Sequence, residues 1–137
     1  MRKLHTLIVI VLSLLVLVPP AAAQEPDDPE KYLLLATSRT GTMEEELNEA
    51  GARGYRFLAT QGGETAFGGS EAVVVMALDP EGRRFSYILL ATSRTGTMER
   101  ELNEAPPEYS VVGMTVFSTR FGGKEAAVIL ETEIAGD

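Results

Sequence analysis

The sequence predicts an α+β fold in which two βαββ repeats form a mainly antiparallel sheet of about six strands, with two helices on one face. The first observation is a stretch of eleven residues, Leu34–Glu44, which recurs unchanged as Leu89–Glu99. The second is that each copy lies between a short apolar run and a segment with helical periodicity. The third is that two more strand-like runs follow each helical segment, so that the repeating unit is strand, helix, strand, strand.

The N-terminal segment has the pattern of a secretory signal peptide. Arg2 and Lys3 precede an apolar run over residues 7–18, and a small-residue ending closes at Ala23. Because the run is too short to span a bilayer comfortably, we expect cleavage after Ala23 and no stable membrane anchor, with an uncleaved anchor as the alternative. The protein is therefore expected to be exported, to a periplasm or out of the cell. Residues 24–30 are polar with two prolines and are expected to form a flexible leader.

Charge and composition narrow the classes of function. Loss of Arg2 and Lys3 leaves 10 basic and 20 acidic residues, a net charge of −10, which disfavours nucleic acid as a partner. The sequence has no Cys, and its one His, His5, lies in the signal peptide. Thiol and imidazole chemistry are thus excluded for the exported chain, and zinc would have only carboxylate ligands. We expect no metal, no cofactor and no enzymatic activity.

The first repeat is expected to span residues 31–78. Thr42, with Glu45 three residues later, has the pattern of a helix N-cap in a capping box. Met43 and Leu47 begin an apolar stripe along this helix, which is expected to end near Gly51. A Gly-rich turn covers residues 62–69, and the strands are predicted at 32–37, 55–61 and 72–78.

The second repeat is expected to span residues 84–133, after a linking turn at 79–83. Its strands are predicted at 85–92, 109–118 and 126–131, and its helix at 97–105. Pro106-Pro107 replaces Gly51-Ala52, so the second helix should end sooner. The two repeats are expected to form one domain. Two helices cover only one face of such a sheet, so we expect the other face to be covered in a homodimer, with a half-barrel as the alternative.

The end of the first helix carries a recognisable pattern. Residues 47–55 read Leu-Asn-Glu-Ala-Gly-Ala-Arg-Gly-Tyr. This resembles a small bacterial βαββ domain family of unknown function, whose members carry Leu-Asn and then Gly-x-x-Gly before Trp or Tyr. The first copy matches over Tyr32–Leu78, whereas the second keeps Leu102-Asn103 and Tyr109 but lacks both glycines. The resemblance implies a fold and no activity.

The repeated loops before the helices are the candidate binding site. They combine hydroxyl groups, a Gly and an Arg with the N–H groups of a helix start, which suits an anion or a phosphate. The alternative is an ordinary strand-to-helix loop, in which Arg39 pairs with a helix glutamate. The candidate residues are Thr37, Ser38, Arg39, Thr40 and Thr42 in the first copy and Thr92, Ser93, Arg94, Thr95 and Thr97 in the second.

Three functions are compatible with these features. The favoured one is an exported, non-enzymatic binding or interaction module that recognises an unknown protein or small ligand through the paired loops. The second is a small-molecule or anion sensor that uses the helix N-termini. The third is a carboxylate-based hydrolase, which depends only on the many glutamates. The simplest interpretation of Glu44, Glu45, Glu46 and Glu49 is a solvated helix face.

Overall fold

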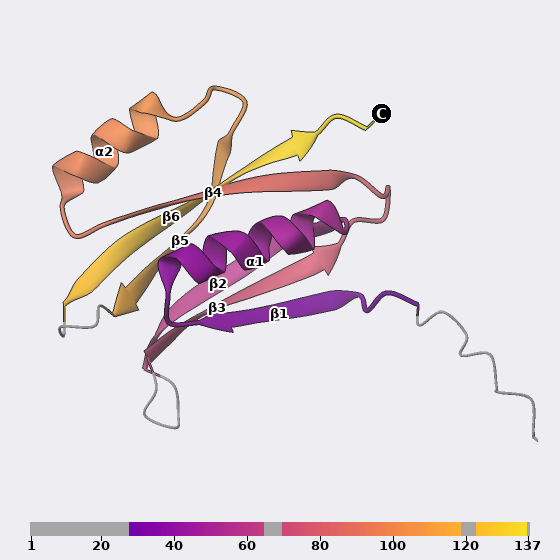
Figure 1. The fold of residues 1–137 in the computed structure, drawn as a ribbon, viewed down its shortest axis with the longest axis horizontal. Coiled ribbons are helices and arrows are strands. Elements are labelled where there is room, and N and C mark those ends of the chain that lie inside the picture. Colours follow the sequence, from indigo (N-terminus) through magenta and orange to yellow (C-terminus); the bar gives the residue numbers. More distant parts are fainter. Residues whose placement is uncertain (1–27, 65–69, 119–122, 137) are drawn as a thin grey trace, which may run out of the picture.

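The computed structural model describes residues 28–64, 70–118 and 123–136. It confirms an α+β fold with six antiparallel strands and two helices (Figure 1). The elements in order are β1 (Tyr32–Thr37), α1 (Thr40–Ala52), β2 (Tyr55–Glu64), β3 (Ser70–Leu78), β4 (Arg84–Thr92), α2 (Thr95–Glu104), β5 (Ser110–Ser118) and β6 (Lys124–Ile134). The predicted signal peptide, residues 24–27 of the leader and residues 65–69 of the Gly-rich turn lie outside the described residues. Within the described ranges, no helix has the length and apolar character needed to cross a membrane.

The six strands are divided between two three-stranded sheets, ordered β1-β3-β2 and β4-β6-β5. The two sheets have the same register, since Leu34 pairs with Val75 and the equivalent Leu89 pairs with Ile129. They also share a bulge, which falls between Phe57 and Ala59 in β2 and between Val111 and Gly113 in β5. Each apolar third strand is therefore central in its sheet, and the first and second strands of each repeat form the edges.

The N-caps of both helices lie three residues earlier than the predicted Thr42 and Thr97, so this prediction was wrong. The N-cap residues are Arg39 and Arg94, and neither makes a side-chain cap hydrogen bond. The hydroxyl of Thr37 instead accepts the N–H of Arg39 at 3.2 Å, in a turn that starts the helix before Thr42 is reached. At the other end, α2 stops at Glu104, before the two prolines, as predicted.

The link between the repeats is a tight turn held by Asp79. Its carboxylate accepts the backbone N–H of Glu81 at 3.0 Å and forms an ion pair with Arg83 at 2.8 Å. Gly82 has a φ of 71°, a left-handed conformation that favours glycine. The hydrogen bonds from Arg83 hold the pKa of the Asp79 carboxyl below its usual range. This local network fixes the point at which β4 leaves the first repeat.

The two repeats turn opposite sides of their sheets toward one shared core. We call the side that a repeat's own helix covers its helix side, and the opposite side its reverse side. In the first repeat the buried residues Leu35 and Val74 lie on the helix side, under α1. In the second repeat Leu89 and Ile129, on the reverse side, join the same core, and Val128 lies on the helix side, outside it. The second repeat thus lays its reverse side on the helix side of the first.

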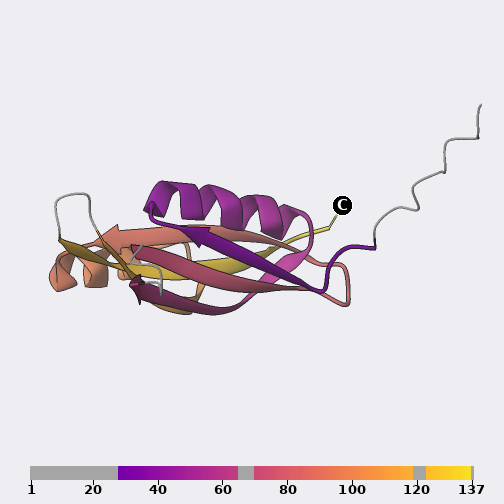
Figure 2. The ribbon, with the colours of Figure 1, turned by 90° about the horizontal axis from the view of Figure 1, so that it is seen from below.

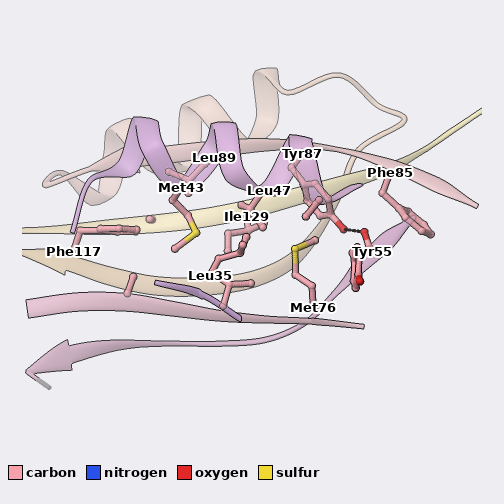
Figure 3. Close-up of a cluster of buried hydrophobic side chains, with 14 residues drawn as sticks. Leu35, Met43, Leu47, Tyr55, Met76, Phe85, Tyr87, Leu89, Phe117 and Ile129 are labelled. Atoms are coloured by element: carbon pink, nitrogen blue, oxygen red, sulfur yellow. Dashed lines mark hydrogen bonds between the residues drawn. The ribbon is translucent and has the colours of Figure 1, made fainter. Parts of the chain in front are cut away.

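Helix α1 is the centre of this arrangement. It contacts β4 of the second repeat as well as β1 and β2 of its own, whereas α2 packs mainly on β4. Figure 2 shows α1 lying along one side of the strands and α2 at one end of the molecule. Met43 and Leu47 of α1 are fully buried between the sheets (Figure 3). Gly51 allows the close approach, because an added Cβ would lie 2.2 Å from the carbonyl oxygen of Phe85.

Candidate functional site

The repeated loops are closed in the same way in both copies. Thr37 and Thr92 accept the N–H groups of Arg39 and Arg94, each at 3.2 Å. The carbonyl of each arginine then accepts a backbone hydrogen bond from its helix, from Met43 in α1 and from both Thr97 and Met98 in α2. The identical sequence therefore gives a similar local structure, in which the hydroxyl groups of Thr37 and Thr92 accept the hydrogen bonds that close the turns.

Both arginine side chains of these loops point into solvent. Arg39 and Arg94 are exposed, and neither forms an ion pair with another described residue. The pairing of Arg39 with a helix glutamate, considered from the sequence, is therefore not observed in the described part of the chain. Figure 1 shows both loops at the same end of the molecule, the end where β1 and β4 finish. The structure does not join them into one site, because their hydrogen bonds stay within each loop.

The second loop adjoins an apolar groove of about 520 Å³. The loop residues Thr92, Ser93, Arg94 and Thr95 form one wall of this groove. Met98 of α2 lies beside them, and Met114, Val116 and Ala126 come from β5 and β6. Lys124 adds a second cation. The groove thus combines a flexible apolar surface with two positive charges.

At the first loop, two of the positions equivalent to groove residues belong to the core. Met43, the counterpart of Met98, and Ala72, the counterpart of Ala126, are fully buried. Gly62, the counterpart of Val116, lies against β5, where a Cβ would come within 2.2 Å of the Val116 carbonyl oxygen. The two loops are identical in sequence and differ in what they adjoin.

A buried carboxylate between the repeats was missed from the sequence. The two oxygens of Glu131 accept hydrogen bonds from Arg56 at 2.9 Å and from the Tyr87 hydroxyl at 3.0 Å. The backbone N–H of Phe57 donates to the same carboxylate at 3.3 Å. Burial, together with the neighbouring Glu131 charge, raises the pKa of the Tyr87 hydroxyl well above its ordinary value. The cluster joins β2, β4 and β6.

The contacts of this cluster are those of a group that stabilises the packing between the two repeats. Each oxygen of Glu131 is engaged by a cation, a hydroxyl or an N–H group, and its partners include no second carboxylate. One sequence signal could have revealed it, since Glu131 directly follows an apolar run over residues 126–130, where the first repeat has Ala77. A charge in such a position requires a partner.

Among the described residues, no group of three or more acidic side chains could hold a metal ion. Glu81 and Glu133 line one hollow of about 550 Å³, but Arg83 lies between them, 3.2 Å and 3.7 Å from their oxygens. Glu44, which we expected on a solvated face, instead accepts the backbone N–H of Leu89 at 2.8 Å.

The chain was also compared with known proteins. The resemblance of residues 47–55 to a βαββ family stays a prediction that these comparisons do not test. No model of a protein family, no curated protein and no solved structure matches the chain.

Proposed function

We propose that the protein is an exported, non-enzymatic interaction module whose contact surface is formed by the loops over residues 37–42 and 92–97. The observation that carries the proposal is the groove beside the second loop, where exposed Arg94 and Lys124 flank Met98 and Met114. A guanidinium group without an internal partner is available for a carboxylate or a phosphate on another molecule. Methionine side chains adapt to differently shaped apolar groups. The expected partner therefore presents an anionic group beside an apolar side chain.

Export is part of this proposal and is supported by the sequence pattern of residues 1–23. The expected outcome is a protein recovered from the periplasmic or secreted fraction, with an N-terminus near Gln24. N-terminal sequencing of the purified chain measures this directly. Recovery of the intact chain in the membrane fraction would instead indicate an uncleaved anchor.

The contact surface is tested with Arg94→Ala beside Arg100→Ala. Both changes remove one exposed positive charge from the start or the body of α2, so they are matched in net charge. We expect a partner captured from the envelope fraction to be retained by wild type and by Arg100→Ala and to be lost by Arg94→Ala. The purified partner should then show the same order of affinities. Equal binding by all three proteins would place the contact elsewhere, and failure to capture any partner would argue against an interaction module.

One observation favours a second candidate function, recognition of a small anion. Neither helix has a side-chain cap, so N–H groups of the first turn face outward at both loops. A thermal-shift screen with phosphate, sulfate and anionic sugars should then give a rise in melting temperature that Arg39→Ala and Arg94→Ala reduce. The absence of any shift at millimolar ligand would count against the sensor.

A further inference from the structure

Inside the chain, α1 covers the open edge of β4 with two side chains. Asn48 accepts the N–H of Tyr87 and donates to the carbonyl of Tyr87, both at 2.9 Å. Glu44 accepts the N–H of Leu89 at 2.8 Å. Because β4 is an edge strand, these side chains satisfy the backbone groups that a neighbouring strand would otherwise pair. The helix therefore replaces the missing strand.

Both parts of this contact, the helix side chains and the edge strand that they bind, occur a second time in the sequence. Glu99 and Asn103 of α2 correspond to Glu44 and Asn48. The acceptor strand also recurs, because Tyr32–Thr37 differs from the equivalent part of β4 at one position only. Since β1 is the edge strand of its own sheet, it presents the same row of backbone groups as β4.

The second set of groups is exposed. Tyr32 and Leu34 have 52% and 64% of their surface accessible, compared with 2% and 9% for Tyr87 and Leu89. Asn103 is exposed, and the hydrogen bond described for its side chain is to the carbonyl of Glu99 in its own helix. The donor surface and the acceptor surface are thus both accessible in one copy of the chain.

The flanking surfaces match in the same way. The reverse side of the first sheet carries Ala59, Val73 and Val75 around a hollow of about 390 Å³. Its counterpart in the second repeat, the side of Leu89 and Ile129, is buried on α1 and the first sheet. The helix side of the second sheet exposes the large apolar residues Val111, Met114 and Val116. The exposed reverse side of the first sheet is thus equivalent to the buried reverse side of the second sheet. The exposed helix side of the second sheet is equivalent to the buried helix side of the first, and inside the chain the two buried sides pack against each other.

We infer that α2 of one copy covers β1 of a second copy, in the way that α1 covers β4 within the chain. A single chain cannot close this contact on itself, because α2 and β1 lie on opposite sides of the molecule with α1 and the other strands between them (Figure 1). The contact is heterologous, so each added copy again presents one α2 and one β1, and association continues past the dimer. The inference is carried by Glu99, Asn103 and β1, which lie outside the groove beside the second loop, while Met114 and Val116 are shared with that groove. It does not depend on the proposed function.

The contact between copies is weaker than the internal one. Val116 and Pro106 occupy the positions of Gly62 and Gly51, at which the internal contact leaves no room for a Cβ. The surfaces must therefore stay further apart at these two points, which reduces packing. The net charge, −10 for the expected exported chain, adds repulsion between copies, so salt should strengthen the association.

Sedimentation velocity tests the inference on the protein expressed with its predicted signal peptide, residues 1–23, and purified from the cell fraction in which it is recovered. Over about 10 μM to 1 mM, a range that brackets weak contacts, we expect the mean mass to rise past that of a dimer. Asn103→Ala and Leu34→Glu should each shift this rise to at least about tenfold higher concentration. Arg100→Ala is the matched control, because its counterpart Glu45 stays exposed in the internal contact. A constant monomer mass up to 1 mM would overturn the inference.

Mixing the variants distinguishes a heterologous contact from a symmetric one. Asn103→Ala keeps an intact β1, and Leu34→Glu keeps an intact α2. An equimolar mixture should therefore form a heterodimer at wild-type affinity and stop there. Association lost in Leu34→Glu but unchanged in Asn103→Ala would indicate β1 pairing with β1, and would overturn the inference. Melting temperatures measured at low concentration should match wild type for both variants, since both positions are exposed.

Discussion

Asn48 in α1 and Asn103 in α2 occupy equivalent positions in the two repeats. The same substitution, to Ala, can therefore be compared at both positions. Asn48 makes three hydrogen bonds to β4, with the N–H and the carbonyl of Tyr87 and with the Ser86 hydroxyl at 3.2 Å. Asn103 makes only a bond of 2.7 Å to the carbonyl of Glu99 among the described residues. We expect Asn48→Ala to destabilise the fold strongly and Asn103→Ala to have almost no effect at low protein concentration.

The magnitude follows from the bonds lost. A hydrogen bond contributes about 1 kcal/mol net, and a partly buried group left without a partner costs about 1–3 kcal/mol. Asn48→Ala leaves the N–H and the carbonyl of Tyr87 without their hydrogen-bond partner. Alanine has the better helix propensity, which offsets about 0.5 kcal/mol, so the free energy of unfolding should fall by roughly 3 kcal/mol. Asn103→Ala exchanges one exposed bond for the same gain in propensity, so its change should stay within about 0.5 kcal/mol of zero.

Urea denaturation followed by far-ultraviolet circular dichroism measures both changes. The protein should be kept near 5 μM, below the range of about 10 μM to 1 mM over which we expect copies to associate. Equal slopes of unfolding free energy against urea would show that the two variants unfold from comparably compact states. A loss of similar size in both variants, or none in either, would refute the assignment of Asn48 as the group that joins α1 to β4.

Three further changes test other contacts in the same assay. Gly51→Ala should lower the free energy of unfolding by about 3 kcal/mol, because the added methyl group would lie 2.2 Å from a carbonyl oxygen of β4. Gly96→Ala is the control and should raise the free energy of unfolding by up to about 0.5 kcal/mol, because nothing lies near its added methyl group. Equal effects would mean that α1 does not approach β4 so closely. Glu131→Ala should cost about 3 kcal/mol by leaving a buried hydroxyl and an arginine without their carboxylate, and a neutral result would show that water replaces it. Because the pKa of Asp79 is lowered in the fold, its stabilising contribution is present above about pH 4 and is lost as the pH falls through the folded value. Asp79→Asn should remove this part of the acid dependence, and an unchanged pH profile would contradict the assignment.

Much of the secondary structure could be predicted because its signals are local. The strand at Tyr32–Thr37 and the early end of α2 before Pro106 both follow from a few neighbouring residues. The helix starts were mispredicted because two hydrogen-bonding hydroxyl groups compete at each loop, and the one before Arg39 closes its turn first. Such a choice between Thr37 and Thr42 depends on geometry that residue types alone do not specify.

The candidate site could be predicted in part. The sequence identified the loops but gave them equal status, whereas the structure places an apolar groove beside Arg94 and fully buries the corresponding residues Met43 and Ala72 in the first repeat. The difference arises from packing between the repeats, which is a long-range property. Glu131 was missed for the same reason, because its partners Arg56 and Tyr87 come from strands far away in the sequence.

The positions at which the two copies differ indicate which side of each repeat is buried. The unchanged stretch cannot do so, because Leu34 and Leu89 have the same neighbours and opposite exposure. Gly113, where the first repeat has Ala59, leaves room for a Phe57 ring that would come within 2.4 Å of any Cβ there.

Other differences fall at the same contact. Phe117 is buried in the core where the first repeat has Gly63, and Glu131 is buried where it has Ala77. In this duplicated chain, several of the residues that differ between the repeats therefore lie where the two repeats pack against each other. The residues that have not diverged, above all Glu99, Asn103 and Tyr32, keep the capacity to make that contact again with another copy.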